Sequence, residues 1–210
     1  MCGIVGITSS KEVTSRIIGS LKKLEYRGYD SAGIATIFEN NINEVKCEGR
    51  VNQLEKNVNQ TNLSGTTGIG HVRWATHGKP STINAHPHSS DNVSVVHNGI
   101  IENSTILKKI LEKKGYKFIS QTDTEVIVHL VTDYLKKNNL KDTIIKVLKK
   151  LHGSFALGII FKDQPDLIIG ARRGSPLAVG YGPDEHYLGS DSYALKSMTN
   201  KISYLNDGEF

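Results

Sequence analysis

The order of the predicted secondary-structure elements constrains the fold most. Alternating apolar residues bounded by turn residues predict strands toward both ends of the chain, and patterns with a helical period gather mainly between them. A parallel sheet would need a helix after nearly every strand. The chain lacks that regular alternation. We therefore predict an α+β fold with two mainly antiparallel sheets, packed face to face and covered by helices.

The individual elements are predicted from apolar periodicity and from turn residues. Strands are expected at 4–8, 31–39, 43–49, 68–74, 93–97, 155–161, 167–171, 177–179, 186–189 and 202–205. Helices are expected at 10–25, 103–114, 126–137, 140–151 and 191–198. Thr122 and Glu125 have the spacing of a capping box ahead of the helix at 126–137. The stretch 75–92 is predicted to be a long loop, and loops of that length often serve as lids over a site.

Size, charge and cysteine content limit the class of protein. The 210 residues suit a single domain spanning 1–210. The net charge of +5 comes largely from lysine pairs on predicted helix faces, so we expect no nucleic-acid partner. Two cysteines provide no disulfide framework. No apolar run reaches the roughly 18 residues of a membrane span. We expect a cytoplasmic protein without a membrane partner.

The second residue carries the most suggestive chemistry. Cys2 is followed by the small residue Gly3, and removal of Met1 would leave Cys2 with both a thiol and a free α-amine. An α-amine has a pKa of about 7.7–8.0, so part of it is neutral near pH 7.5 and can accept the thiol proton. Nucleophile and base would then lie on one residue. A cysteine that merely begins a buried strand is the alternative.

Other side chains form a set that suits a free amino acid with a side-chain amide. Arg73 lies where a predicted strand opens into the long loop, and a guanidinium binds a carboxylate through two parallel hydrogen bonds. Asn98 and Gly99 follow a predicted strand at a tight turn, where an amide N–H and a backbone N–H could hold an oxyanion. Asp123, at a helix start, could hold an ammonium group or only cap the helix.

Five histidines between residues 71 and 97 raise the alternative of a metal site. A zinc site needs three or four converging ligands, and neither a CxxC nor an HExxH pattern accompanies these histidines. We expect no metal and no cofactor. His86 and His97 are instead expected to hydrogen-bond the loop and turn backbone around the site.

Several long ordered motifs point to one family. The chain resembles the N-terminal glutaminase domain of the glutamine–fructose-6-phosphate aminotransferases (isomerizing), also called glucosamine-6-phosphate synthases, among the class II glutamine amidotransferases. The motifs that carry this resemblance are CGIVG at 2–6, LEYRGYDSAG at 24–33, HVRWATHG at 71–78, NAHPH at 84–88, HNGIIEN at 97–103, TDTE at 122–125 and RGSPL at 173–177.

The resemblance implies a fold and a role for each matched position. The fold is the four-layer αββα sandwich of N-terminal-nucleophile hydrolases. Cys2 would attack the carboxamide of L-glutamine, its own amine would move the proton, and Asn98 and Gly99 would form the oxyanion hole. The residues that would bind glutamine and then L-glutamate are Arg73 at the α-carboxylate, helped by Thr76 and His77, and Asp123 at the α-ammonium. Arg27 would order the terminal residue, and Trp74 on the lid would gate the ammonia path.

The resemblance also implies a larger protein. Complete family members add two sugar-isomerase domains that bind fructose 6-phosphate, and they form homodimers; 210 residues do not accommodate those domains, so we expect this chain to be one domain of a longer protein. Alone it should form glutamate and ammonia but no amino sugar. Two alternatives stay open, namely the glutaminase domain of another class II amidotransferase and a catalytically silent amino-acid-binding domain.

Overall fold

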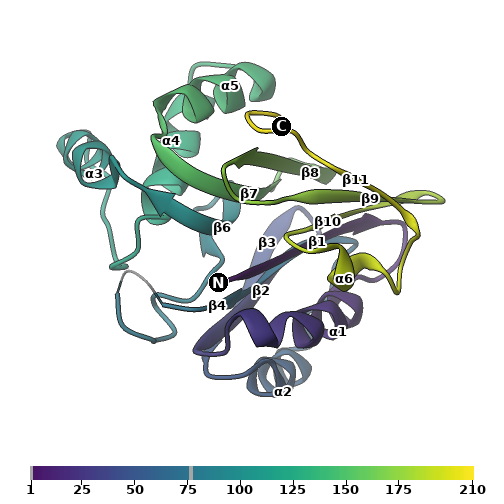
Figure 1. Ribbon diagram of the computed structural model, residues 1–210. Helices are drawn as coiled ribbons and strands as arrows, with labels where there is room; N and C mark the ends of the chain where they lie inside the picture. Colours follow the sequence, from purple (N-terminus) through teal and green to yellow (C-terminus); the bar gives the residue numbers. More distant parts are fainter. Residues whose placement is uncertain (1, 76–77) are drawn as a thin grey trace.

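The computed structural model describes residues 2–75 and 78–210, and their strands form two antiparallel sheets (Figure 1). The larger sheet has the strand order β11-β9-β10-β1-β4-β2-β3. Its strands are β1 (Gly3–Ser9), β2 (Ser31–Phe38), β3 (Asn41–Glu48), β4 (Thr67–Arg73), β9 (Ala178–Gly182), β10 (Glu185–Gly189) and β11 (Lys201–Tyr204). The smaller sheet, in the order β5-β6-β7-β8, contains β5 (His88–Ser89), β6 (Val93–Ile101), β7 (Gly153–Phe161) and β8 (Gln164–Arg173).

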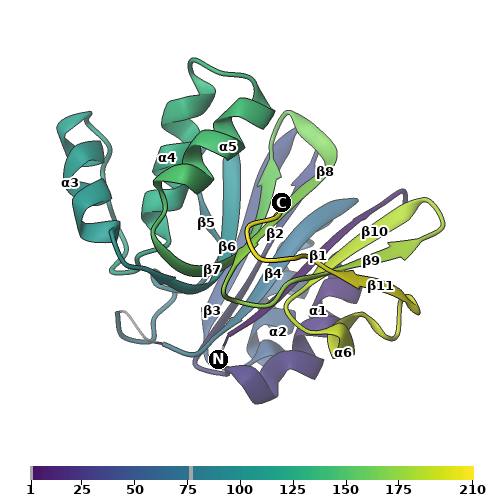
Figure 2. The ribbon, with the colours of Figure 1, turned by 45° about the horizontal axis from the view of Figure 1, so that its top comes forward.

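Helices cover the outer face of each sheet, so the domain has four layers (Figure 2). Helices α1 (Thr14–Leu24) and α2 (Val51–Thr61) pack on the larger sheet. Helices α3 (Ser104–Lys113), α4 (Glu125–Leu135) and α5 (Leu140–Lys150) pack on the smaller one. The 3₁₀ helix η1 (Glu25–Arg27) follows α1, and α6 (Ser192–Leu195) lies against α1. The α+β class and the two antiparallel sheets predicted from the sequence are confirmed.

The central strands are buried on both faces because they lie between a helix layer and the other sheet. Side chains alternate between the two faces of a strand. In β1, Val5 and Ile7 face the core under α1 and α2, whereas Ile4 faces the core between the sheets. In β7, Phe155 packs under the helices and Ala156 faces the other sheet. The same alternation decides which polar side chains reach the space between the sheets.

Helix α2 is an element that the sequence analysis missed. Its buried residues Val51, Leu54 and Val58 have helical spacing, but the rest of the segment is polar and no side chain of its own caps the first turn. The cap is tertiary, since the Glu25 carboxylate accepts a hydrogen bond from the Val51 N–H at 2.7 Å. Such a carboxylate satisfies an otherwise unpaired N–H and favours the positive end of the helix dipole.

Within the described residues, no helix combines the length and the apolar composition that crossing a membrane requires.

Candidate active site

Strand alternation brings four of the polar side chains to the space between the sheets. Ile4 of β1, Ile69 of β4 and Val96 of β6 belong to the core between the sheets. Side chains two or four residues away along the same strand direction point the same way. Those positions hold Cys2, His71, Arg73 and Asn98.

The Cys2 thiol lies half-buried at the end of β4. Its Sγ accepts a hydrogen bond from the Trp74 N–H at 3.2 Å and lies 3.5 Å from the Trp74 carbonyl oxygen. Neither group is a base. Among the described residues, no basic side-chain nitrogen hydrogen-bonds this sulfur. Within residues 2–75 and 78–210, the geometry therefore presents the thiol to a ligand without a histidine partner.

Burial raises the pKa of the Cys2 thiol above its ordinary value. The Trp74 N–H and the charge of Arg73 favour the thiolate and offset part of this effect. The thiol is thus predominantly protonated at neutral pH. A reaction at this sulfur needs a proton acceptor close to it.

The backbone of Cys2 is held from two sides. Its carbonyl oxygen accepts hydrogen bonds from Arg27 Nε at 3.2 Å and from Asn98 Nδ2 at 3.1 Å. Arg27 is itself fixed by an ion pair with Asp191, at 2.8 Å. Asp191 also accepts a hydrogen bond from the Tyr26 hydroxyl. Arg27 therefore lies where the sequence predicts a residue that orders Cys2, and Asp191 is a supporting residue that the sequence analysis missed.

Two pockets meet at the thiol. The first is lined by the predicted residues Cys2, Arg73, Trp74, His86, His97, Gly99 and Asp123, together with Thr122 and Thr124. The second is lined by Cys2, Arg27, Trp74, Asn98, Gly99, Ile100, Ser175 and Pro176. The pockets share Cys2, Trp74 and Gly99. Thr76 and His77, the other two predicted site residues, lie outside the described residues.

Opposite charges line the first pocket. Arg73 is only 4% exposed, and its Nη2 donates a hydrogen bond to the Gly78 carbonyl at 3.2 Å, which links the end of β4 to Gly78. Asp123 contributes a carboxylate whose Oδ2 accepts a hydrogen bond from the Ile101 N–H at 2.7 Å. A guanidinium and a carboxylate that line one pocket with a thiol can bind a zwitterionic amino acid.

The predicted capping box at residues 122–125 is wrong. Asp123 bonds to β6, and the Thr122 hydroxyl bonds to His88 and Ser120. The Glu125 carboxylate accepts hydrogen bonds from the Ile119 and Ser120 N–H groups. These side chains bond to the preceding loop residues, to His88 and to β6 in place of the helix end. They anchor the segment that carries Asp123 against the smaller sheet.

The predicted tight turn at Asn98-Gly99 is also wrong, because β6 continues through both residues to Ile101. Gly99 has φ +128°, a conformation that other residues rarely adopt. A Cβ at this position would lie 2.0 Å from the Ser154 carbonyl oxygen of β7. The glycine thus allows an irregular strand, and Gly99 lines both pockets.

We expect Gly99→Ala to destabilise the domain by about 2–4 kcal/mol, since strain at positive φ adds to a backbone clash. Gly115 has φ +90° but no heavy atom within 4 Å of a Cβ, so Gly115→Ala should cost only about 1 kcal/mol. Urea unfolding measures the loss of stability in both variants, and the difference between the two losses is the cost of the clash with Ser154. Equal losses of stability would contradict the clash.

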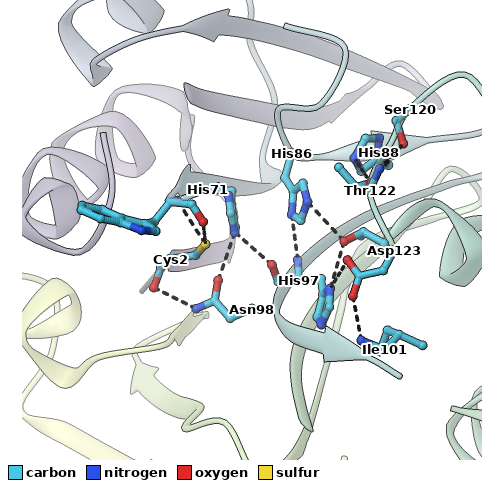
Figure 3. Close-up of polar contacts among 12 residues, drawn as sticks. Cys2, His71, His86, His88, His97, Asn98, Ile101, Ser120, Thr122 and Asp123 are labelled. Atoms are coloured by element: carbon cyan, nitrogen blue, oxygen red, sulfur yellow. Dashed lines mark hydrogen bonds and ion pairs between the residues drawn. The ribbon is translucent and has the colours of Figure 1, made fainter. Parts of the chain in front are cut away.

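Four buried histidines link the strands beside the pocket (Figure 3). His86 Nδ1 accepts a hydrogen bond from the His97 N–H at 3.3 Å, and its Nε2 lies 3.2 Å from Thr124 Oγ1. His97 Nδ1 lies 2.9 Å from the same oxygen and 4.0 Å from Asp123 Oδ1. The His86 ring thus bonds to the backbone of β6, and both rings bond to the Thr124 side chain just before α4. Among residues 2–75 and 78–210, no group of His, Cys, Asp or Glu side chains is arranged to hold a metal ion.

Burial lowers the pKa of His71 and of His88 to about 3. Both rings are neutral in the folded domain, whereas the unfolded chain takes up a proton at each ring below pH 6.5. The free energy of unfolding should therefore fall as the pH drops below 6.5, with a slope approaching about 1.4 kcal/mol per pH unit for each histidine.

Urea unfolding at pH 7.5, 6 and 5 measures this slope. His88→Gln keeps a donor for Thr122 and removes one titrating ring, so its slope should be smaller by about 1.4 kcal/mol per pH unit. A slope unchanged in His88→Gln would show that His88 does not contribute to the acid sensitivity.

The chain is similar to known glutamine amidotransferases. The family described as "Glutamine amidotransferase domain" matches residues 72–197. The glutamine–fructose-6-phosphate aminotransferases (isomerizing) of Bradyrhizobium diazoefficiens and Mesorhizobium japonicum are each 54% identical to the chain over its whole length. The chain spans 35% of each of those relatives.

A solved structure of glutamine phosphoribosylpyrophosphate amidotransferase from B. subtilis is similar to the domain, with a TM-score of 0.81 and 30% sequence identity. The similarity covers 99% of this chain and 45% of that one. It confirms the fold that the sequence resemblance implies. From the matched family, the relatives and the shared fold, the chain belongs to the glutamine amidotransferase domain family.

Proposed function

We propose that this domain hydrolyses L-glutamine to L-glutamate and ammonia through a thioester on Cys2. The observation that carries the proposal is the position of the thiol in a pocket lined by Arg73 and Asp123. Arg73 binds the α-carboxylate and Asp123 the α-ammonium group. The side-chain amide of glutamine then extends toward Cys2.

The reaction uses the α-amine that Cys2 gains when Met1 is removed. The amine takes the thiol proton while Sγ bonds to the amide carbon, and the carbonyl oxygen becomes an oxyanion held by Asn98 Nδ2 and the Gly99 N–H. Collapse of this intermediate breaks the C–N bond, and the amine returns the proton to the departing ammonia. Water then attacks the thioester, with the same amine as base, and releases glutamate and the thiol. A protonated thiol needs a proton acceptor close to Sγ, and the amine of the same residue supplies one.

Further residues support this reaction. Arg27 donates a hydrogen bond to the Cys2 carbonyl oxygen and so fixes the positions of the amine and the thiol. His86 and His97 fix the pocket wall through Thr124. Thr76 and His77 assist Arg73 at the α-carboxylate. Donors fixed in advance at a developing charge are the largest catalytic contribution in many enzymes.

Trp74 lies where the two pockets meet. It lines both pockets, is 48% exposed, and contacts the Tyr29 ring edge-on at a centroid distance of 5.7 Å. We propose that the Trp74 side chain controls the passage of ammonia from the first pocket to the second. The second pocket then faces the domain that consumes ammonia.

In the longer protein, the ammonia converts fructose 6-phosphate to glucosamine 6-phosphate on sugar-isomerase domains. This assignment follows the relatives that are 54% identical over the whole chain. The protein is a cytoplasmic homodimer in this proposal, and residues 1–210 form its glutaminase domain.

The test of the proposal is a glutaminase assay on the 210-residue chain lacking Met1. We expect glutamate and ammonia in equal amounts from glutamine, and no amino sugar when fructose 6-phosphate is added. Glutamine binding without product would identify a silent binding domain and overturn the proposal. Faster turnover of another amide would favour an amidase of a different specificity.

A further inference from the structure

His71 contacts Asn98, one of the two residues that would hold the oxyanion, and is completely buried. Its Nε2 is 3.0 Å from the His97 carbonyl oxygen and 3.0 Å from Asn98 Oδ1 (Figure 3). Both partners are oxygen acceptors, so Nε2 must carry the ring proton. The described linings of the two pockets do not include His71, so it does not touch a ligand there.

The other ring nitrogen selects the same tautomer. His71 Nδ1 is buried and has no hydrogen-bond partner among the described residues. A proton there would create a buried N–H without an acceptor, which costs more than an unsatisfied lone pair. The neutral ring protonated at Nε2 is therefore the form that fits this position.

This tautomer determines how the Asn98 amide is oriented. The two ends of an amide have nearly the same shape, so hydrogen-bond partners decide which end lies where. With Oδ1 on His71, Nδ2 donates to the Cys2 carbonyl oxygen at 3.1 Å. A flipped amide would place oxygen against the Cys2 carbonyl and N–H against the His71 N–H. Both contacts would then be repulsive.

We propose that His71 is a positioning residue of the glutaminase reaction, holding the Asn98 amide so that its nitrogen faces Cys2 and the developing oxyanion. The inference rests on the proposed function. One hydrogen of Nδ2 bonds to the Cys2 carbonyl oxygen, and the other is available to the oxyanion. His71 thereby acts on the transition state through Asn98, without contacting glutamine.

The test compares a variant that lacks the donor with one that keeps it. His71→Leu has a similar volume but no N–H, and we expect kcat to fall about a hundredfold with little change in KM for glutamine. His71→Gln carries an amide N–H near the position of Nε2, and we expect kcat within about tenfold of the unaltered domain. His152→Leu, at an exposed histidine, is the control and should keep full activity.

A double-mutant cycle separates positioning from general loss of structure. If His71 acts through Asn98, His71→Leu should change kcat less than about twofold in an Asn98→Ala background. If the factors by which His71→Leu and Asn98→Ala each lower kcat multiply fully in the double variant, the positioning role is overturned. An equal loss of kcat in His71→Gln and His71→Leu, or full kcat in His71→Leu, would also overturn it. Unfolding curves confirm that each variant is folded at the assay temperature.

The two proposals fail in different ways. A chain lacking Met1 that does not hydrolyse glutamine overturns the proposed function and the positioning role with it. An active chain whose His71→Leu variant keeps full kcat overturns only the role of His71. Nitrogen NMR of the His71 ring checks the tautomer independently, because a proton on Nδ1 would contradict the orientation argument.

Discussion

The Cys2→Ala variant should fold normally and lose glutamine hydrolysis by a factor of about 10⁴ or more, as expected when a nucleophile is removed. The fold should survive because Cys2 is half-buried and its carbonyl contacts with Arg27 and Asn98 involve the backbone, which alanine retains. The measurements are kcat for glutamine, the unfolding curve and glutamine binding. Activity retained in the alanine variant would contradict the mechanism.

The second cysteine provides a matched control with the opposite expectation. Cys47 is 4% exposed and packs in the core under α1 and α2 with Val51 and Leu54. Cys47→Ala should lower the free energy of unfolding by about 1–2 kcal/mol and leave kcat unchanged. Together the two variants separate reactive from structural cysteine.

Arg73→Ala should raise KM for glutamine about a hundredfold and change kcat far less. A charge-assisted hydrogen bond contributes about 1.5–3 kcal/mol, and the α-carboxylate is bound equally in the ground state and the transition state. Arg73→Lys retains the charge without the planar fork and should have an intermediate KM. Steady-state kinetics measure all three proteins, and an unchanged KM in Arg73→Ala would show that the carboxylate binds elsewhere.

A truncated substrate tests the same contact from the ligand side. 4-Aminobutanamide is glutamine without its α-carboxylate, so the unaltered domain should process it with a kcat/KM lower by about the same factor as the Arg73→Ala variant shows with glutamine. Arg73→Ala should lose little further on this substrate. If the losses in kcat/KM from Arg73→Ala and from the missing α-carboxylate multiply instead, Arg73 does not bind that carboxylate.

Local sequence patterns were enough to predict most elements of the fold. The helix predicted at 140–151 is found at Leu140–Lys150, and the strand at 4–8 is found at Gly3–Ser9. Helix α2 was missed because its cap, Glu25, comes from another part of the chain. The helix predicted at 10–25 begins only at Thr14, where the Glu12 carboxylate accepts a hydrogen bond from the Thr14 N–H.

The sequence predicted the site residues whose type and motif indicate their chemistry. It predicted less well the residues whose role depends on their place in the fold. Cys2, Arg73 and Asp123 stand out by type and motif, and the structure places them around one pocket. His71 could have been found from the sequence, because it shares the strand face of Arg73. Asp191 could not, since its ion pair with Arg27 joins positions that no local pattern relates.

The central claim is that Cys2 works as a terminal residue, with its own amine as base. The direct measurement is intact mass combined with a glutaminase assay while an aminopeptidase removes Met1 from chains that retain it. We predict that kcat rises in proportion to the fraction of chains that have lost the mass of one methionine residue, and that chains retaining Met1 do not turn glutamine over. Full turnover by chains retaining Met1 would contradict the account.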